Sequence, residues 1–433
     1  MNQNTPLKPD RVRDLLKKEI KRHRDKTEYS VIISSAENVL TILQNDSVFQ
    51  NIKFNIMRGW PEAVDGKHRR QWTDTDDARM RTYIEKEYYI ASRSKIDDAF
   101  RVYCGEREYH PVQERLRSIK WDGEERVSEF FIKWMKAEDT PYNRECSRLT
   151  FAGGVNRAFS PGCKFDSVPV LIGDQGGGKS TMCQWLAMDS DFYNSTKTMS
   201  GQKGYEAISG KWIVEIEELL AVIANEKQGQ KVEESAKAFL STQSDFYRKP
   251  YDHRPLDNPR HCIFIGTTNR SEFLTDRTGN RRWYPIRCNQ NASYIYRHED
   301  EIRNDIEQCW AEMLAAYDAG DDFVRPTPKL ELLNTIATQQ EEAEIEDPRK
   351  GQIEEYLSDK NKVCLLQIWH ECLYPNASNP PQMQRKDSLE ISEILLHKLH
   401  WERGLVDRFG PEYGRQKSYL RPGTAGKSDV PPF

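Results

Sequence analysis

Several features that would place the chain in a class at once are missing from it. The nine cysteines are scattered and no two of them form a C-x-x-C pair, which argues against a disulfide framework or a zinc ribbon and fits reduced thiols. No apolar run approaches the roughly 20 residues that a membrane-spanning helix requires. The first residues show no signal-peptide pattern. We therefore expect a cytoplasmic protein that does not contact a membrane.

A strong net charge is also missing. The 64 Lys and Arg residues nearly balance the 68 Asp and Glu residues, which leaves a formal charge of -4. The chain is thus not a uniformly basic nucleic-acid coat, and any contact with nucleic acid must come from local patches. No internal repeat is visible. With 433 residues, 37% of them hydrophobic, the chain is long enough for two or three domains with cores of their own.

The clearest pattern lies at residues 168–187. An apolar run is followed by a glycine-rich loop that fits G-x-x-x-x-G-K-[ST], and then by a stretch with helical spacing. Glycines let the backbone N–H groups approach a polyphosphate, and the start of the helix adds its positive end. Lys179 is expected to reach the β- and γ-phosphates and Ser180 to bind Mg²⁺. The predicted ATP-binding residues are Gly173, Asp174, Gln175, Gly176, Gly177, Gly178, Lys179, Ser180 and Thr181.

A second apolar run, at residues 210–219, ends in carboxylates. A buried strand has this pattern when its carboxyl end opens on a ligand crevice. One acid there can hold Mg²⁺ through water, and a neighbour can orient or deprotonate the attacking water. Three acids compete for these roles: Glu215, Glu217 and Glu218. Strand alternation places Glu215 and Glu217 on one face, and we predict that Glu217 holds the metal together with Ser180. A solvated acidic turn is the alternative.

Two further groups of polar residues suggest phosphoryl-transfer chemistry. A third apolar strand, at residues 261–268, ends at Asn269, whose amide could bind the attacking water or the γ-phosphate. Arg281 and Arg282 follow in a Gly-Asn turn and suit an arginine finger, which stabilises the charge that develops during transfer. Which of the two arginines acts, and whether it acts across a subunit boundary, stays open, and surface arginines before a strand are the alternative.

Between the acidic strand and the Asn269 strand lies an insertion, residues 237–254, in which basic and aromatic residues alternate. The basic side chains can bind backbone phosphates of a nucleic acid, and the aromatic rings can stack on its unstacked bases. The insertion is our candidate contact with nucleic acid, and a packed structural loop is an equal alternative. The residues predicted to contact nucleic acid are Lys237, Arg248, Lys249, His253 and Arg254.

The rest of the chain is organised around this core. Residues 8–26 hold nine Lys and Arg against four Asp and Glu, with apolar residues at helical spacing as far as Ile20. We expect a solvated helix there, with an arm that touches DNA as the alternative. Near the C-terminus, helices followed by a basic hairpin suggest a winged helix, and a protein-docking domain is equally plausible. The predicted parts are a polar segment (1–28), a mostly helical domain (29–135), a P-loop domain (136–325), a helix and linker (326–350), a winged-helix-like domain (351–422) and a tail (423–433).

Taken together, these motifs resemble the virulence-associated protein E family of phages, prophages and pathogenicity islands, which is similar to superfamily three helicases and poxvirus-type primase-helicases. The match runs in order from about residue 109 to residue 325. The segments that carry it are Gly173–Thr181, Trp212–Leu219, Lys237–Ser241 with Tyr247–Tyr251, Phe264–Asn269 and Asp276–Pro285, preceded by Tyr109–Val112 and Trp121–Gly123.

The resemblance implies an α/β P-loop core of the AAA+ type, a homo-oligomeric ring, normally a hexamer, and ATP-dependent unwinding of DNA in the cytoplasm of a bacterial host. Single-stranded DNA would pass through the channel of the ring. Relatives carry acids that match Glu215 and Glu218, whereas the wider superfamily points to Glu217 and Glu218. No stretch resembles a primase catalytic domain. The alternatives are an ATP-switched DNA-binding or replication-assembly factor that does not unwind and, less strongly supported, a small-molecule kinase.

Overall fold

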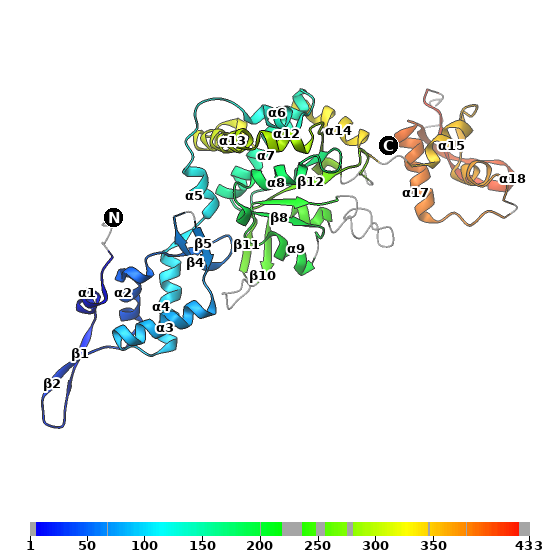
Figure 1. Ribbon diagram of the computed structural model, residues 1–433. Helices are drawn as coiled ribbons and strands as arrows, with labels where there is room; N and C mark the ends of the chain where they lie inside the picture. The colour runs from blue at the N-terminus through cyan, green and yellow to red at the C-terminus, as the bar shows by residue number, and fades with distance from the viewer. Residues whose placement is uncertain are drawn as a thin grey trace. The chain divides into compact units, whose positions relative to one another are not determined.

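The computed structural model describes residues 6–66, 68–199, 201–218, 236–247, 256–274, 280–344, 347–377 and 379–423 (Figure 1). The chain divides into two compact units, Met1–Ala343 and Glu344–Phe433. The boundary lies within the segment that the sequence predicts to be a helix and linker. All nine cysteines are among the described residues and all are free thiols. Within the described part, no helix is long and apolar enough to cross a membrane.

The N-terminal part of the first unit combines helices with a four-stranded sheet of order β5-β4-β3-β6. Its core is a separate cluster that includes Val39, Ile42, Ile84 and Tyr103. The prediction of a mostly helical domain therefore omitted this sheet. The elements are α1 (Pro9–Leu15), β1 (Lys18–Arg22), β2 (Glu28–Ile32), α2 (Ala36–Asn45), η1 (Ser47–Phe49), β3 (Ile52–Asn55), β4 (Trp60–Asp65), β5 (His68–Gln71), α3 (Asp74–Tyr88), α4 (Arg93–Glu106) and β6 (Glu108–Tyr109).

The solvated helix predicted through Ile20 is wrong beyond Leu15. The helix α1 ends at Leu15, and residues from Lys18 onward form the antiparallel hairpin β1–β2. The helical spacing did not determine the structure here because Ile20 is 71% exposed and contributes nothing to a buried helical face. Without that burial, periodicity carries little weight against pairing with β2.

The central feature of the first unit is a five-stranded sheet of order β13-β7-β12-β9-β8, in which every neighbouring pair is parallel. The strands β7, β9 and β12 confirm the three predicted apolar strands. All three are fully buried, as expected for a parallel sheet that is covered on both faces. The strand bounds are β7 (Val168–Ile172), β8 (Tyr193–Thr196), β9 (Ile213–Ile216), β12 (Ile263–Thr268) and β13 (Trp283–Arg287).

Two hydrophobic clusters cover the two faces of this sheet. Leu171 and Ile265 belong to one cluster, and Val170 and Phe264 belong to the other, as strand alternation requires. The first cluster also contains buried side chains from the stretch between Val112 and Ala137, so packing continues across the predicted domain boundary at residue 135. The remaining elements are α5 (Pro111–Arg117), η2 (Val127–Glu129), α6 (Phe130–Met135), α7 (Pro141–Phe159), α8 (Lys179–Leu186), η3 (Ser190–Phe192), α9 (Gly201–Ile208), β10 (Ser244–Tyr247), β11 (Leu256–Pro259), η4 (Asn280–Arg282), α12 (Ala292–Arg297), α13 (Glu299–Ala319), η5 (Asp322–Val324), η6 (Leu330–Leu332) and α14 (Leu333–Glu342).

A pair of histidines joins the start of α5 to the start of β12. The Nδ1 atom of His110 accepts the backbone N–H of Gln113, so the Nε2 atom carries the proton and donates to Nδ1 of His261 at 3.0 Å. Burial lowers the pKa of His110 to about 4. His110 is therefore a neutral structural residue.

The second unit contains helices and a three-stranded antiparallel sheet of order β14-β16-β15. The predicted hairpin near the C-terminus is confirmed as β15–β16. The elements are α15 (Arg349–Tyr356), β14 (Lys362–Val363), α16 (Leu365–Gln367), the π-helical turn η7 (Ile368–Leu373), α17 (Arg385–Glu393), the π-helical turn η8 (Ile394–Lys398), β15 (Glu402–Arg408), α18 (Gly410–Tyr413) and β16 (Arg415–Leu420).

Candidate nucleotide site

The glycine-rich loop joins the carboxyl end of β7 to the start of α8, as the sequence predicts. A Cβ atom at Gly173 would lie 2.7 Å from the carbonyl oxygen of Cys288, so only glycine fits there. Gly178 has φ +80° and precedes the first residue of α8. The first N–H groups of α8 have no capping side chain, which leaves them available to an anion.

Lys179 reaches back over this loop. Its Nζ atom donates to the carbonyl oxygens of Gly173 and Asp174, at 2.7 Å in both cases. Burial lowers the pKa of the amine. The ammonium group thus lies at the mouth of the loop, where a phosphate bound by the backbone would meet it.

A segment at the start of α12 packs against the same loop, and no motif in the sequence indicates this contact. The Nε2 atom of Gln290 donates to the carbonyl oxygen of Gly177 at 2.6 Å. The side chain of Ile295 lies so close to Gly178 that a Cβ atom there would be 2.9 Å from it. Gln290 and Ile295 therefore hold the loop and the start of α8 in place.

Glu215 lies beside Ser180 and is completely buried. Its Oε1 atom accepts hydrogen bonds from the Ser180 hydroxyl at 2.6 Å and the Thr267 hydroxyl at 2.7 Å. Its Oε2 atom accepts from Tyr193, and burial together with this bond raises the pKa of the tyrosine. Oxygen ligands of this kind, with one carboxylate, are what Mg²⁺ prefers next to bound phosphates. The residues present therefore fit the metal that the motif implies.

Glu217, which we predicted to hold the metal with Ser180, lies elsewhere. The strand β9 ends at Ile216, so the alternation that would place Glu217 beside Glu215 stops one residue too early. Glu217 and Glu218 are in a turn, and both carboxylates lie near Lys197, at 3.8 and 3.5 Å. Of the three competing acids, the structure brings only Glu215 to Ser180.

Asn269 directly follows β12, next to the P-loop. Thr268 pairs with Ile172 in the parallel ladder, and the backbone N–H of Gly173 donates to the carbonyl oxygen of Thr268 at 3.3 Å. Asn269 is exposed at the same sheet edge. The carboxyl ends of β7, β9 and β12 thus bring Lys179, Glu215 and Asn269 to one edge, as expected for parallel strands.

The arginine pair lies at the amino ends of the strands, on the opposite side of the sheet from the P-loop. Arg281 and Arg282 precede β13, whose first residue, Trp283, pairs with the first residue of β7. The five residues of β7 separate this point from the P-loop by about 16 Å at the usual rise of a strand. An arginine side chain does not span that distance, so neither arginine reaches the P-loop of its own chain.

The two arginines differ in their surroundings. The Arg282 guanidinium donates to the Ser241 hydroxyl at 3.0 and 2.8 Å and lies 3.5 Å from Asp166. Burial lowers its pKa. The Arg281 side chain is 71% exposed and lies 4.0 Å from Asp166. Arg282 is therefore held within the chain, whereas Arg281 is accessible to another molecule.

The basic and aromatic insertion includes β10, which pairs in an antiparallel hairpin with β11, a strand that begins after the insertion ends. Arg248, Lys249, His253 and Arg254 lie outside the described residues. Lys237 is described and lies in a helical stretch at 236–241. Beside the connection between the strands, Phe246 is 70% exposed and Leu256 is 53% exposed. The hairpin β10–β11 thus presents apolar side chains on the surface.

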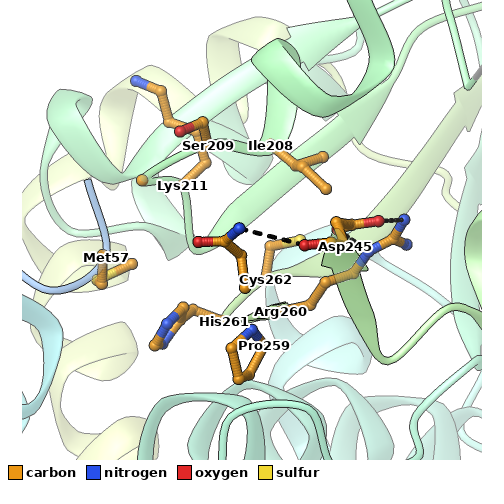
Figure 2. A pocket seen from close by; sticks show the side chains of 11 residues that line it. Met57, Ile208, Ser209, Lys211, Asp245, Pro259, Arg260, His261 and Cys262 are labelled. Carbon is orange, nitrogen blue, oxygen red and sulfur yellow. Dashed lines mark hydrogen bonds and ion pairs between the residues drawn. The ribbon is translucent and has the colours of Figure 1, made fainter. Parts of the chain in front are cut away.

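The hairpin is anchored by a buried ion pair (Figure 2). The Arg260 guanidinium donates to both carboxylate oxygens of Asp245, at 2.7 and 2.8 Å, and it stacks over the Phe239 ring at 4.3 Å. Both side chains of the pair are at most 4% exposed. Removing one partner would leave a buried charge without compensation.

We expect Asp245→Ala to lower the free energy of unfolding by about 3–5 kcal/mol because it leaves the Arg260 charge buried and unpaired. Asp257→Ala is the matched control, since Asp257 is an exposed carboxylate on the same hairpin, and it should change stability by no more than about 0.5 kcal/mol. Denaturant titration measures both values. Equal stabilities of the two variants would show that the ion pair does not anchor the hairpin.

The model of the virulence-associated protein E-like domain matches residues 116–345, which is 230 of the 433 residues and includes the whole nucleotide site. The chain belongs to the virulence-associated protein E-like family. This confirms the resemblance that the sequence motifs indicated.

Other comparisons are looser. No curated protein matches the sequence. Among solved structures, an apo form of the NrS-1 C-terminal region has a TM-score of 0.46 at 14% identity, over 85% of this chain and 95% of that one. A JCV helicase has a TM-score of 0.27 at 13% identity, over 60% of this chain and 79% of that one. Both TM-scores are below 0.5, so the overall likeness of this virulence-associated protein E-like chain to either structure is loose.

Proposed function

We propose that this protein is an AAA+ ATPase that works as a DNA helicase or translocase in the replication of a phage or mobile element. One observation carries the proposal: three adjacent strand ends bring Lys179, Glu215 and Asn269 to one edge, around a loop shaped for a triphosphate. Membership of the family supports it.

Within this site each residue has a distinct task. The backbone of residues 173–178 and the start of α8 bind the phosphates, and the Lys179 ammonium neutralises the β- and γ-phosphate charge. Ser180 and Glu215 would hold Mg²⁺, which supplies positive charge against the phosphate oxygens. Asn269, at the neighbouring strand end, orients the attacking water or the γ-phosphate. Glu217 and Glu218 stay candidates for activating that water.

The position of Arg281 supports hydrolysis between subunits. Arg281 is exposed but lies at the far edge of the sheet from the P-loop of its own chain. An arginine finger must contact the γ-phosphate region, so Arg281 would serve the site of a neighbouring copy. Copies related in this head-to-tail manner form a ring when the rotation between neighbours closes. We propose a hexamer, with single-stranded DNA in its channel.

Arg282 gives this arrangement a physical link to DNA. It holds Ser241, which ends the helical stretch that leads into the hairpin β10–β11. We propose that the insertion, residues 237–254, contacts the DNA strand through Lys237, Arg248, Lys249, His253 and Arg254. Movement of the hairpin would then reach Arg281 through Arg282. The second unit would serve as a winged-helix-like accessory domain.

The test is ATP hydrolysis with and without single-stranded DNA, followed by strand displacement on forked DNA. We expect DNA to stimulate hydrolysis and the forked duplex to be opened, while a Lys179→Ala preparation made in parallel reports only background. Hydrolysis without displacement would instead favour the ATP-switched DNA-binding or assembly factor. If the unaltered protein hydrolysed ATP no faster than Lys179→Ala does, the proposed ATPase activity would be refuted.

A further inference from the structure

Tyr296 is a large aromatic residue on the surface beside the P-loop. It lies in α12 and is 59% exposed, yet its hydroxyl is 3.4 Å from the Thr181 hydroxyl at the start of α8. Its ring meets the Trp185 ring edge-on, with centroids 6.3 Å apart and an angle of 83°. Thr181 and Trp185 are four residues apart, so they lie on one face of α8. The ring of Tyr296 is thus fixed over that face and still open to solvent.

The face of α8 that carries Thr181 and Trp185 differs from the face that carries Ser180 and the candidate metal site. Successive residues of a helix point about 100° apart. Ser180 points to Glu215, the side on which the proposed function places Mg²⁺ and the γ-phosphate, whereas Thr181 points to Tyr296. The loop binds the α- and β-phosphates and Lys179 reaches the β- and γ-phosphates. The sugar and base of a nucleotide must therefore extend away from the Glu215 side.

We infer that Tyr296 is the platform on which the nucleobase stacks. This inference rests on the proposed function and names the residue that would distinguish a nucleotide from a bare polyphosphate. A base has two flat π-faces, and an aromatic side chain held beside the triphosphate can cover one of them. The contacts of Gln290 and Ile295 with the P-loop fix the distance between the platform and the phosphates.

Stacking of this kind is worth enough to measure. Removal of an aromatic platform generally weakens the binding of a base by about tenfold to a hundredfold. The effect depends on the ring and not on the hydroxyl, so phenylalanine should replace tyrosine with little loss. It also depends on the base, so a ligand made of phosphates alone should not sense the substitution.

The experiment measures the binding of MgATP and of magnesium tripolyphosphate to the full chain by calorimetry. We expect Tyr296→Ala to weaken ATP binding about tenfold to a hundredfold and to leave tripolyphosphate binding unchanged, and Tyr296→Phe to bind both within about threefold of the unaltered protein. Tyr29→Ala is the matched control, because Tyr29 is an exposed tyrosine on the hairpin β1–β2.

Two results would overturn the inference. Equal weakening of ATP and tripolyphosphate binding by Tyr296→Ala would mean that Tyr296 only supports the loop, and unchanged ATP binding would mean that the base lies elsewhere. Failure of the proposed function gives a different pattern. In that case the unaltered protein binds neither ligand, or Lys179→Ala binds both as well as the unaltered protein does.

Discussion

Arg281→Ala is expected to lower DNA-stimulated ATP hydrolysis by about a thousandfold or more, because an arginine finger typically contributes that much to phosphoryl transfer. ATP binding should change little, since Arg281 lies at the far sheet edge from the P-loop of its own chain. The measurement is steady-state turnover at saturating ATP, together with the binding constant for ATP. A large fall in turnover with nearly unchanged binding identifies a residue that acts on the transition state.

Arg101→Ala serves as the control for this variant, because Arg101 is an exposed arginine in the N-terminal part with a side chain that is 56% exposed. It should keep normal turnover. Arg282→Ala should behave differently from both. It removes the contacts with Ser241 and Asp166, so it should lower stability and weaken the stimulation by DNA. If Arg281→Ala turned over ATP normally, the residue would not be a finger.

Glu215→Gln is expected to lower ATP hydrolysis by about 10²–10³-fold and to raise the Mg²⁺ concentration required for activity. The substitution keeps the size of the side chain but removes the fully buried carboxylate charge that lies beside Ser180. Electrostatic groups placed at such a site typically contribute this much to catalysis. The measurement is a titration of activity with Mg²⁺ at saturating ATP.

Glu217→Gln is the comparison that makes this result specific. If Glu217 activates water, its loss lowers turnover but leaves the Mg²⁺ requirement unchanged, because its carboxylate lies near Lys197 and not near Ser180. Thermal unfolding checks that Glu215→Gln is folded, since Tyr193 and Thr267 also donate to this carboxylate. A raised Mg²⁺ requirement for Glu217→Gln alone would restore the original assignment of the metal to Glu217.

The strands that form the site could be predicted from the sequence because each is an apolar run that ends in polar residues. The runs before Gly173, Glu217 and Asn269 are β7, β9 and β12, and the parallel sheet places their carboxyl ends together. A fully buried parallel sheet makes hydrophobicity a reliable local signal. The glycine-rich loop was equally clear, since the spacing of its residues follows from the phosphates it must bind.

Features that depend on where an element stops, or on what it packs against, were not predictable in this way. Strand alternation linked Glu217 to Glu215 only if β9 continued, and β9 ends at Ile216. The helix expected through Ile20 is replaced by a hairpin because the apolar side chain of Ile20 is not buried. Tyr193 and Tyr296 reach the site through tertiary contacts, and nothing near them in the sequence marks this role.

The most direct test of the account mixes two inactive proteins. Lys179→Ala subunits lack the phosphate contact and Arg281→Ala subunits lack the finger, so each preparation alone should show only background ATP hydrolysis. In an equal mixture, about a quarter of the head-to-tail interfaces would combine an intact P-loop from one subunit with an intact Arg281 from its neighbour. We predict that the mixture regains a comparable fraction of the normal turnover. A mixture as inactive as its components, although the subunits exchange, would contradict a site shared between neighbouring copies.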